Sequence, residues 1–463
     1  MQIPKGLKKT VTSISVTSVL QSVIIFSYIF CMSYFSEVSE YAQYRKYFYI
    51  IDFTTALSLF GINTLLLRKD KDFISSNIVS SILIIDFLSL LSIVVFGIIN
   101  SLSWIVFVQI LFFVILNTLY QIITGLIIRF QKYELYFRST FSNFIVVSII
   151  LAYLIQQDKL TFANVYYVRI GSLILYILPF FITFWKYIIE IKRPNVRKVW
   201  LLFKETYPIG LGVILGSFTL YADKFIASLM NDYDLAVYAN ASASIPFVGV
   251  AITTMSAYYI PIIHREYIDS NLENAKKSLK ELFLFGGYIG IIVFSILFCN
   301  AKTIVTLLYS AKYSDSITLF QIFCLSYLLR IISYTHVIVA LELEKIILRR
   351  MAVELFLQVI VSVLLYKCFG VYGLAASVIL VLACWSVPYN VYYFSKKLRC
   401  NIKDIIPFKK LGIFFLKCFA AYYAINLLVD YLCDNALIKI VISSVLFLIV
   451  NNKEIKYVLQ KLR

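Results

Sequence analysis

Apolar segments, each long enough to cross a lipid bilayer, follow one another from residue 11 almost to the C-terminal end of this sequence. Hydrophobic residues occupy 61% of the 463 positions. A single soluble core cannot bury so much apolar surface, because cores stop growing beyond roughly 250–300 residues. The chain is therefore predicted to fold in a membrane, and its function must depend on the few polar groups that remain inside the bilayer.

The apolar segments predict helices. A crossing helix needs about 20 mostly apolar residues, and the sequence has fourteen such windows, with twelve as the alternative because the last two are the weakest. The windows are continuous rather than alternating, which favours helices over a β-barrel. We therefore predict an all-α integral membrane protein with helices near 11–34, 46–67, 73–98, 104–129, 138–156, 162–186, 205–229, 235–260, 281–300, 317–340, 347–368, 372–394, 410–430 and 436–452.

The basic residues predict the orientation of these helices. The chain has 43 Lys and Arg against 25 Asp and Glu, a net charge of +18. Basic residues concentrate in short cytoplasmic loops of membrane proteins. With the N-terminus inside, 32 of the 43 fall in inside segments. This predicts an even helix count with both termini in the cytoplasm, and lipid headgroups rather than nucleic acid as the partner of the positive charge.

The spacing of the helices predicts two blocks. Tyr41-Ala42-Gln43 opens the second helix of one block, and Tyr238-Ala239-Asn240 opens the second helix of the other, each after a short acidic turn. A parallel repeat of this kind is common in transporters, which place the substrate site between the halves. The predicted parts are an N-terminal six-helix bundle, a basic cytoplasmic linker, a C-terminal six-helix bundle, and an appended helix pair with a basic tail: 1–190, 191–204, 205–395 and 396–463.

Ionisable residues at membrane depth are the candidate site residues. Each costs about 3 kcal/mol at a helix centre on insertion scales, so it usually faces a partner or a water-filled cavity. One interpretation makes them structural, with Glu354 as the partner of Arg330. The other places Arg169, Lys224 and Arg330 on a cavity that attracts an anion. The full set is Asp52, Asp86, Arg169, Asp223, Lys224, Arg330, Glu354 and Lys417, of which the last is expected to extend toward the headgroups.

The acidic members allow two further interpretations. Asp52, Asp86 and Asp223 can pair with basic residues or bind a coupling cation, and for Asp52 pairing is the safer interpretation. Asp223 and Lys224 are adjacent in the sequence, so they lie about 100° apart around a helix and at most one points into a central cavity.

Enzyme chemistry has no support in the sequence. It contains no GxSxG, HExxH or P-loop spacing, and the predicted loops are too short for a catalytic domain. Its eight cysteines are scattered, without a metal-binding spacing. We predict no catalytic residue, metal site, disulfide or cofactor.

Four stretches carry a resemblance to a known family: 36–68, with Tyr-Ala before its helix; 208–261, with Asp223 and a second Tyr-Ala; 307–313; and 369–376. In this order they resemble the polysaccharide-synthesis flippases, the O-antigen exporter branch of the multidrug/oligosaccharidyl-lipid/polysaccharide exporter superfamily. The resemblance covers about residues 1–395. The chain departs at Glu40, Val237 and Ser310, where the family often has Gly.

The resemblance implies two six-helix bundles in a V around a central cavity that opens alternately to the two sides of the bacterial cytoplasmic membrane. The implied activity is outward flipping of an undecaprenyl-pyrophosphate-linked oligosaccharide for O-antigen or capsule synthesis, with a polysaccharide polymerase and a chain-length regulator as partners. Cavity cations would compensate the pyrophosphate charge. The alternative is a cation-coupled drug or metabolite exporter of the same superfamily. Such exporters often have acidic groups in the first helix, and 11–34 has none.

Overall fold

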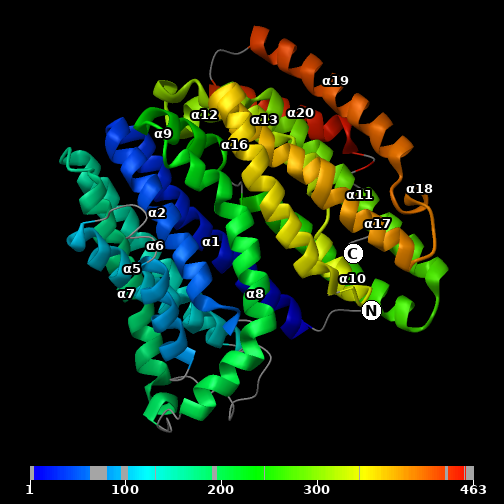
Figure 1. The fold of residues 1–463 in the computed structure, drawn as a ribbon. Coiled ribbons are helices and arrows are strands. Elements are labelled where there is room, and N and C mark those ends of the chain that lie inside the picture. Colours follow the sequence, from blue (N-terminus) through cyan, green and yellow to red (C-terminus); the bar gives the residue numbers. More distant parts are fainter. Residues whose placement is uncertain are drawn as a thin grey trace. The chain divides into compact units, whose positions relative to one another are not determined.

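The computed structural model describes residues 5–62, 81–94, 103–130, 132–189, 196–243, 246–343, 345–432, 436–452 and 454. Within these ranges the regular structure is helical throughout (Figure 1). Nine of the described helices are long and apolar enough to cross a membrane, and Ser81–Val94 and Val441–Val450 are shorter apolar helices. The predicted all-α membrane fold is confirmed. The predicted helix 73–98 lies partly outside the described residues, as do the ends of some others.

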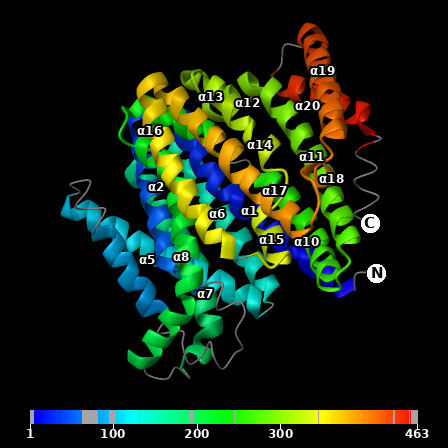
Figure 2. The same ribbon diagram turned by 45° about the vertical axis from the view of Figure 1, so that its right-hand side comes forward.

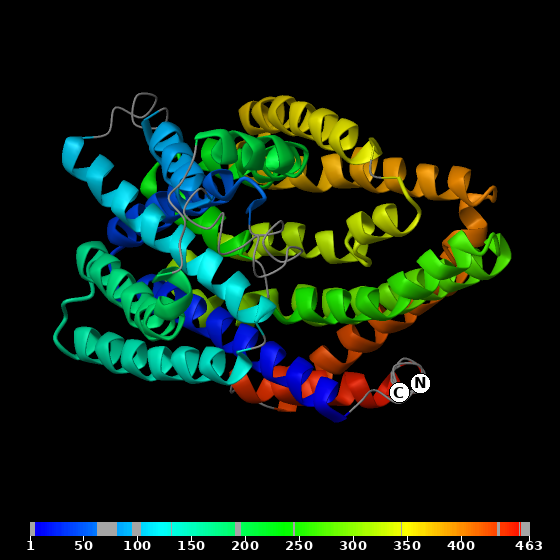
Figure 3. The same cartoon turned by 90° about the horizontal axis from the view of Figure 1, so that it is seen from below.

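The chain divides into two compact units, residues 1–228 (unit 1) and residues 229–463 (unit 2). Unit 1 contains α1 (Lys5–Phe35), α2 (Val38–Leu59), α5 (Trp104–Arg129), α6 (Tyr133–Gln156), α7 (Phe162–Ile189) and α8 (Val196–Ala227). Helices α6 and α7 pack against each other, and Figure 3 shows them side by side and joined by a short connection.

Helix α8 packs with unit 1. The ring of Phe53 on α2 lies 4.9 Å from that of Phe218 and 4.8 Å from that of Phe225. Gly210 lies against the ring of Phe60, where a Cβ would approach to 2.6 Å. The sequence-based division instead placed 205–229 in the second bundle. Two six-helix bundles around a central cavity stay a prediction.

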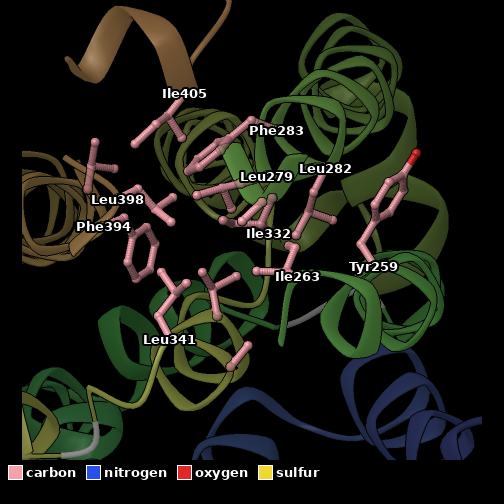
Figure 4. Close-up of a cluster of buried hydrophobic side chains, with 14 of the residues drawn as sticks. Tyr259, Ile263, Leu279, Leu282, Phe283, Ile332, Leu341, Phe394, Leu398 and Ile405 are labelled. Carbon is pink, nitrogen blue, oxygen red and sulfur yellow. The ribbon is translucent and has the colours of Figure 1, made fainter. Parts of the chain in front are cut away.

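Unit 2 consists of α9 (Asp232–Ala241), α10 (Pro246–Ile268), α11 (Leu272–Cys299), α12 (Ala301–Tyr309), η1 (Ala311–Tyr313), α13 (Ser316–Cys324), α14 (Ser326–Leu329), α15 (Tyr334–Ala340), α16 (Lys345–Val381), η2 (Leu382–Ser386), α17 (Val387–Lys397), α18 (Ile402–Ile405), α19 (Phe408–Leu432) and α20 (Ala436–Val450). Its core includes buried side chains of α10, α11, α17 and α18, and of connections between helices. Figure 4 shows them converging: Tyr259, Ile263, Leu279, Leu282, Phe283, Ile332, Leu341, Phe394, Leu398 and Ile405.

Helix α16 is a hairpin. Gly370 has φ 59° and ψ −140°, a conformation that side chains disfavour. In a straight helix Ser362 and Ser377 would lie about 22 Å apart, but their hydroxyl oxygens are 2.8 Å apart. A Cβ at Gly373 would lie 2.0 Å from the carbonyl oxygen of Leu365, so the two halves approach closely at a glycine. The predicted boundary between helices 347–368 and 372–394 is confirmed.

Three predicted elements differ from the structure. The helix predicted at 235–260 is two helices, and Pro246 begins the second, a position that suits proline. The helix predicted at 317–340 is broken into α13, α14 and α15. The connection between the predicted helices 281–300 and 317–340 contains a further helix, α12, which buries Ala301, Val305 and Tyr309 at a spacing of four residues.

The helices predicted as an appended pair, α19 and α20, belong to the core of unit 2. They lie beside each other, and α19 packs on α11 (Figure 2). The buried hydroxyl of Tyr422 contacts the amide nitrogen of Asn300 and lies 3.1 Å from the Ser443 hydroxyl. Asn426 donates to the carbonyl oxygen of Cys299 at 3.3 Å. A buried polar cluster therefore joins the C-terminal helices to the rest of the unit.

Candidate functional site

Arg169 on α7 lies in a cage of aromatic rings within unit 1. Its guanidinium carbon lies 3.7 Å from the ring centre of Phe48, 5.4 Å from that of Tyr28 and 5.6 Å from that of Phe113. Its Nη1 donates to the hydroxyl of Tyr44 at 3.2 Å. A desolvated cation over a ring face gains about 2 kcal/mol. Helices α1, α2 and α5 thus stabilise the charge of a residue that the sequence assigned to anion binding.

Asp52 on α2 lies in the field of two arginines. The charges of Arg169 and Arg45 both act on its carboxylate. Arg45 is buried and donates to the hydroxyl of Tyr49 at 3.0 Å. Opposite charges nearby favour the charged form of a carboxylate. The pairing and the ion-coupling interpretations of Asp52 both stay predictions.

Asp223 and Lys224 on α8 meet despite their adjacent positions. The Nζ of Lys224 lies 3.4 Å from the Oδ1 of Asp223 and donates to the carbonyl oxygen of Leu220 at 2.8 Å. The lysine chain is long enough to bend back along its own helix, so the two charges need not lie on one face. Asp223 therefore compensates the charge of Lys224, which makes this lysine the weakest of the three candidate cations for an external anion.

Two other candidate residues have different surroundings. Asp86 lies in the helix Ser81–Val94, and its buried Oδ1 has no hydrogen-bond partner among the described residues. Both flanking stretches, 63–80 and 95–102, lie outside those residues. Lys417 on α19, which was expected to extend toward the headgroups, has its Nζ 2.8 Å from the Oε1 of Glu454.

Arg330 lies at a break in a membrane-spanning segment. The segment Ser316–Ala340 is apolar enough to cross a membrane, but α14 ends at Leu329 and α15 begins at Tyr334. Arg330 has φ −91° and ψ 46°, which is not helical. Its side chain is exposed and forms no ion pair or hydrogen bond with any residue that the structure describes.

The predicted partner of Arg330 is bound elsewhere. The Oε2 of Glu354 lies 3.6 Å from the Nε of Arg350, one turn earlier on α16. The expectation that Glu354 pairs with Arg330 is therefore wrong. A carboxylate four residues from an arginine on one helix lies close to it without any tertiary packing. Glu354 therefore pairs with Arg350 rather than with Arg330.

The break is held by packing against α11. A Cβ at Gly286 would lie 2.0 Å from the carbonyl oxygen of Ile331, and a Cβ at Gly290 would lie 2.6 Å from that of Tyr327. Glycines four residues apart allow backbones to approach closely inside membranes. The hydroxyl of Tyr334 donates to the carbonyl oxygen of Leu329 at 2.8 Å and closes the break from the other side.

Sequence reasoning missed Arg350, which it counted among the cytoplasmic basic residues. The structure buries it with 8% of its surface exposed. Its Nη1 donates to Asn390 at 3.2 Å, and its carbonyl oxygen accepts from the indole of Trp385 at 3.3 Å. The spacing of Arg350 and Glu354 on one helix is a signal that could have marked it.

These geometries suit the binding of an anion more than covalent chemistry. Arg330 is exposed, and an arginine carries five N–H donors in a fork that matches phosphate oxygens. In the part of the chain that the structure describes, no three His, Cys, Asp or Glu side chains are close enough to hold a metal ion. His336, six residues after Arg330, is exposed as well, and its Nδ1 contacts the hydroxyl of Ser333.

Comparisons with known proteins concern the fold. No protein-family model and no curated protein matches this chain. Among solved structures, a lipid II flippase MurJ in an inward closed conformation is similar over 97% of this chain and 99% of its own, with 16% identity and a TM-score of 0.67. An inward-facing MATE-family multidrug resistance transporter of the MOP superfamily is similar over 84% of this chain and 99% of its own, with 14% identity and a TM-score of 0.62.

A further MOP-superfamily transporter, from Pyrococcus furiosus, is similar over 87% of this chain and 100% of its own, with 13% identity and a TM-score of 0.54. Identities this low establish the fold and nothing finer. The similarity covers most of the chain, including the nine span candidates among the described residues. The chain has the fold of the MOP-superfamily membrane transporters.

Proposed function

We propose that the chain is a flippase that moves undecaprenyl-pyrophosphate-linked oligosaccharide repeat units across the bacterial cytoplasmic membrane for surface polysaccharide synthesis, as O-antigen or capsule. The observation that carries the proposal is Arg330, an exposed arginine at a break in a membrane-spanning helix. Flipping breaks no covalent bond, so the proposal requires no catalytic group.

The cost of an exposed charge supports an aqueous or ligand-bound setting for Arg330. A cation at membrane depth costs about 3 kcal/mol on insertion scales. Non-helical backbone at this depth is tolerated where it is buried in protein or lines a water-filled cavity. Broken helices form the substrate sites of many transporters. The fork of donors on Arg330 matches a pyrophosphate, which would supply the missing negative charge.

The other candidate residues have ranked roles in this proposal. Arg169 is a second cation, whose charge the aromatic cage already stabilises. Lys224 contributes least because Asp223 compensates it. Asp86 and Asp223 are candidates for ion coupling, and Asp52 is one in spite of its arginine neighbours. The proposed partners are a polysaccharide polymerase and a chain-length regulator, and both termini are proposed to lie in the cytoplasm.

The second candidate function is a cation-coupled drug or metabolite exporter. The similarity to a multidrug transporter supports it. Two observations weigh against it. The structure that matches 97% of this chain is named a lipid II flippase, whereas the multidrug transporter matches 84%. The first helix also has no acidic residue among positions 11–34.

Substitution of Arg330 tests the proposal in the host bacterium. Arg330→Ala should reduce surface polysaccharide at least about tenfold, because it removes a charge-assisted bond worth roughly 1.5–3 kcal/mol. Lipid-linked repeat units should then accumulate in the inner leaflet. Arg349→Ala is the control, since Arg349 is exposed near the start of α16. Normal surface polysaccharide in Arg330→Ala at equal protein level would rule the proposal out, and increased drug sensitivity instead would support the exporter.

A further inference from the structure

The residue at issue is Arg350, which the proposed function does not use. It is buried on the second turn of α16 and binds the chain segment 385–390 twice. Its Nη1 donates to the Oδ1 of Asn390 at 3.2 Å, and Asn390 is itself buried. Its carbonyl oxygen accepts a hydrogen bond from the indole N–H of Trp385 at 3.3 Å. One residue therefore fixes two side chains of a neighbouring helix.

That neighbouring helix contains a π-turn. Residues Leu382–Ser386 form η2, a π-helix, and the N–H of Val387 bonds to the carbonyl oxygen of Leu382. A π-turn holds one more residue than an α-turn, is uncommon, and often marks a functional position. Trp385 lies within the turn, and Asn390 lies one helical turn after it. The two bonds to Arg350 thus hold the π-turn itself and the helical turn that follows it.

The π-turn in turn contacts the break that presents Arg330. Segment η2 packs against α14, whose last residue precedes Arg330. After the break, the ring of Tyr334 stacks on that of Phe394 of α17, with 6.5 Å between centres and 14° between planes. Both ends of the break are therefore held by the helix that Arg350 fixes.

Unsatisfied groups suggest that this arrangement is not made for stability alone. The Nε of Arg350 is buried and forms no hydrogen bond among the described residues, since its ion-pair partner, the Oε2 of Glu354, lies 3.6 Å away. The buried hydroxyl of Ser386 has no hydrogen-bond partner there either. Buried polar groups without a hydrogen bond destabilise a fold, and a hydrophobic residue at position 350 would avoid that loss. Retention of the guanidinium is explained if its geometry is needed.

We propose that Arg350 is a positioning residue for the anion site at Arg330. Its bonds to Trp385 and Asn390 fix the π-turn, and the π-turn holds α14 so that the chain breaks at residues 330–333. The proposal rests on the proposed function for the role of Arg330, but the positioning itself is measurable without any substrate.

Amide hydrogen exchange of the purified full chain measures the positioning. Arg350→Lys keeps the charge near Glu354 and loses the fork, Asn390→Ala removes the acceptor, and Trp385→Phe removes the indole N–H. We expect each to speed exchange in residues 325–334 by roughly 2- to 30-fold, the range of such couplings, with α19 unchanged. Arg349→Lys, at the adjacent exposed arginine, should change neither segment.

The combined variant Arg350→Lys/Asn390→Ala should exchange no faster than the faster single variant, because both changes break one bond. Unchanged exchange in residues 325–334 for all three single variants would overturn the positioning role. Should Arg350→Lys fail to fold, Asn390→Ala and Trp385→Phe decide the question, since both leave Arg350 in place.

Transport in the same variants separates this inference from the proposed function. If residues 325–334 loosen and polysaccharide export falls as in Arg330→Ala, both are supported. If the segment loosens in these variants, but export stays normal both in them and in Arg330→Ala, the positioning role of Arg350 stands and the function proposed for Arg330 is wrong.

Discussion

Replacement of Gly286 by alanine tests how the break at Arg330 is held. An added Cβ would lie 2.0 Å from the carbonyl oxygen of Ile331 and 2.9 Å from its carbonyl carbon. Both are backbone atoms, so no side-chain rotation can relieve the contact. The helix α11 or the broken segment must move by more than about 1 Å to reach ordinary contact distance.

The expected magnitude follows from two opposing effects. Alanine gains up to about 1 kcal/mol over glycine within a helix, and overpacking in a tight core costs about 1–3 kcal/mol or more. Backbone displacement places Gly286→Ala at the upper end, a net loss of about 2 kcal/mol. At roughly 2–4 °C per kcal/mol for a domain of this size, the unfolding midpoint of the purified protein in detergent should fall by roughly 4–8 °C.

Gly125→Ala and Gly171→Ala are matched controls, because a Cβ at either helical glycine has no neighbour within 4 Å. They should be neutral or raise the midpoint slightly. Thermal unfolding followed by tryptophan fluorescence measures all three variants. A Gly286→Ala protein as stable as Gly125→Ala, with normal polysaccharide export, would show that the close contact does not hold the break.

Two further substitutions test other strained or buried positions. Ser310 has φ 73° and ψ 156°, a region almost restricted to glycine, so Ser310→Gly should stabilise unit 2 by about 1 kcal/mol. The control Ser314→Gly, at φ −54°, should destabilise unit 2 slightly. A lower unfolding midpoint for Ser310→Gly would contradict the positive φ at this residue. Tyr422→Phe should cost about 1–3 kcal/mol, because it removes the buried hydroxyl that contacts both Asn300 and Ser443. Tyr423→Phe, at a residue that is 58% exposed, should stay within about 0.5 kcal/mol; equal midpoints would refute the polar cluster.

The parts of the fold that could be predicted are those marked by the length of an apolar window or by a glycine that interrupts one. Helix 104–129 was predicted with the same bounds that the structure gives α5, because its window is apolar and sharply bounded. The turn at Gly370 was predicted because the apolar window is interrupted there. Ser310 stands where the resembled family often has Gly, and its positive φ gives the physical reason.

The unpredictable part depends on contacts between distant segments. Nothing local marks the break at Arg330, since residues 329–333 contain neither proline nor glycine. Its cause lies about 40 residues earlier, in Gly286 and Gly290. The aromatic rings around Arg169 come from three helices, α1, α2 and α5, and no local pattern indicates that these helices meet α7 there. Charge counts likewise gave no sign that Arg350 is buried, because a count does not distinguish a solvated arginine from a buried one.

The contact between Asn300 and Tyr422 has a consequence for biosynthesis. These residues are 122 positions apart, and ribosomes add about 5–20 residues per second. Synthesis of Tyr422 therefore follows that of Asn300 by roughly 6–24 s. During that interval the Asn300 amide still donates to the carbonyl oxygen of Ile296 at 2.9 Å, so the C-terminal end of α11 reaches its full set of polar contacts only after α19 is made.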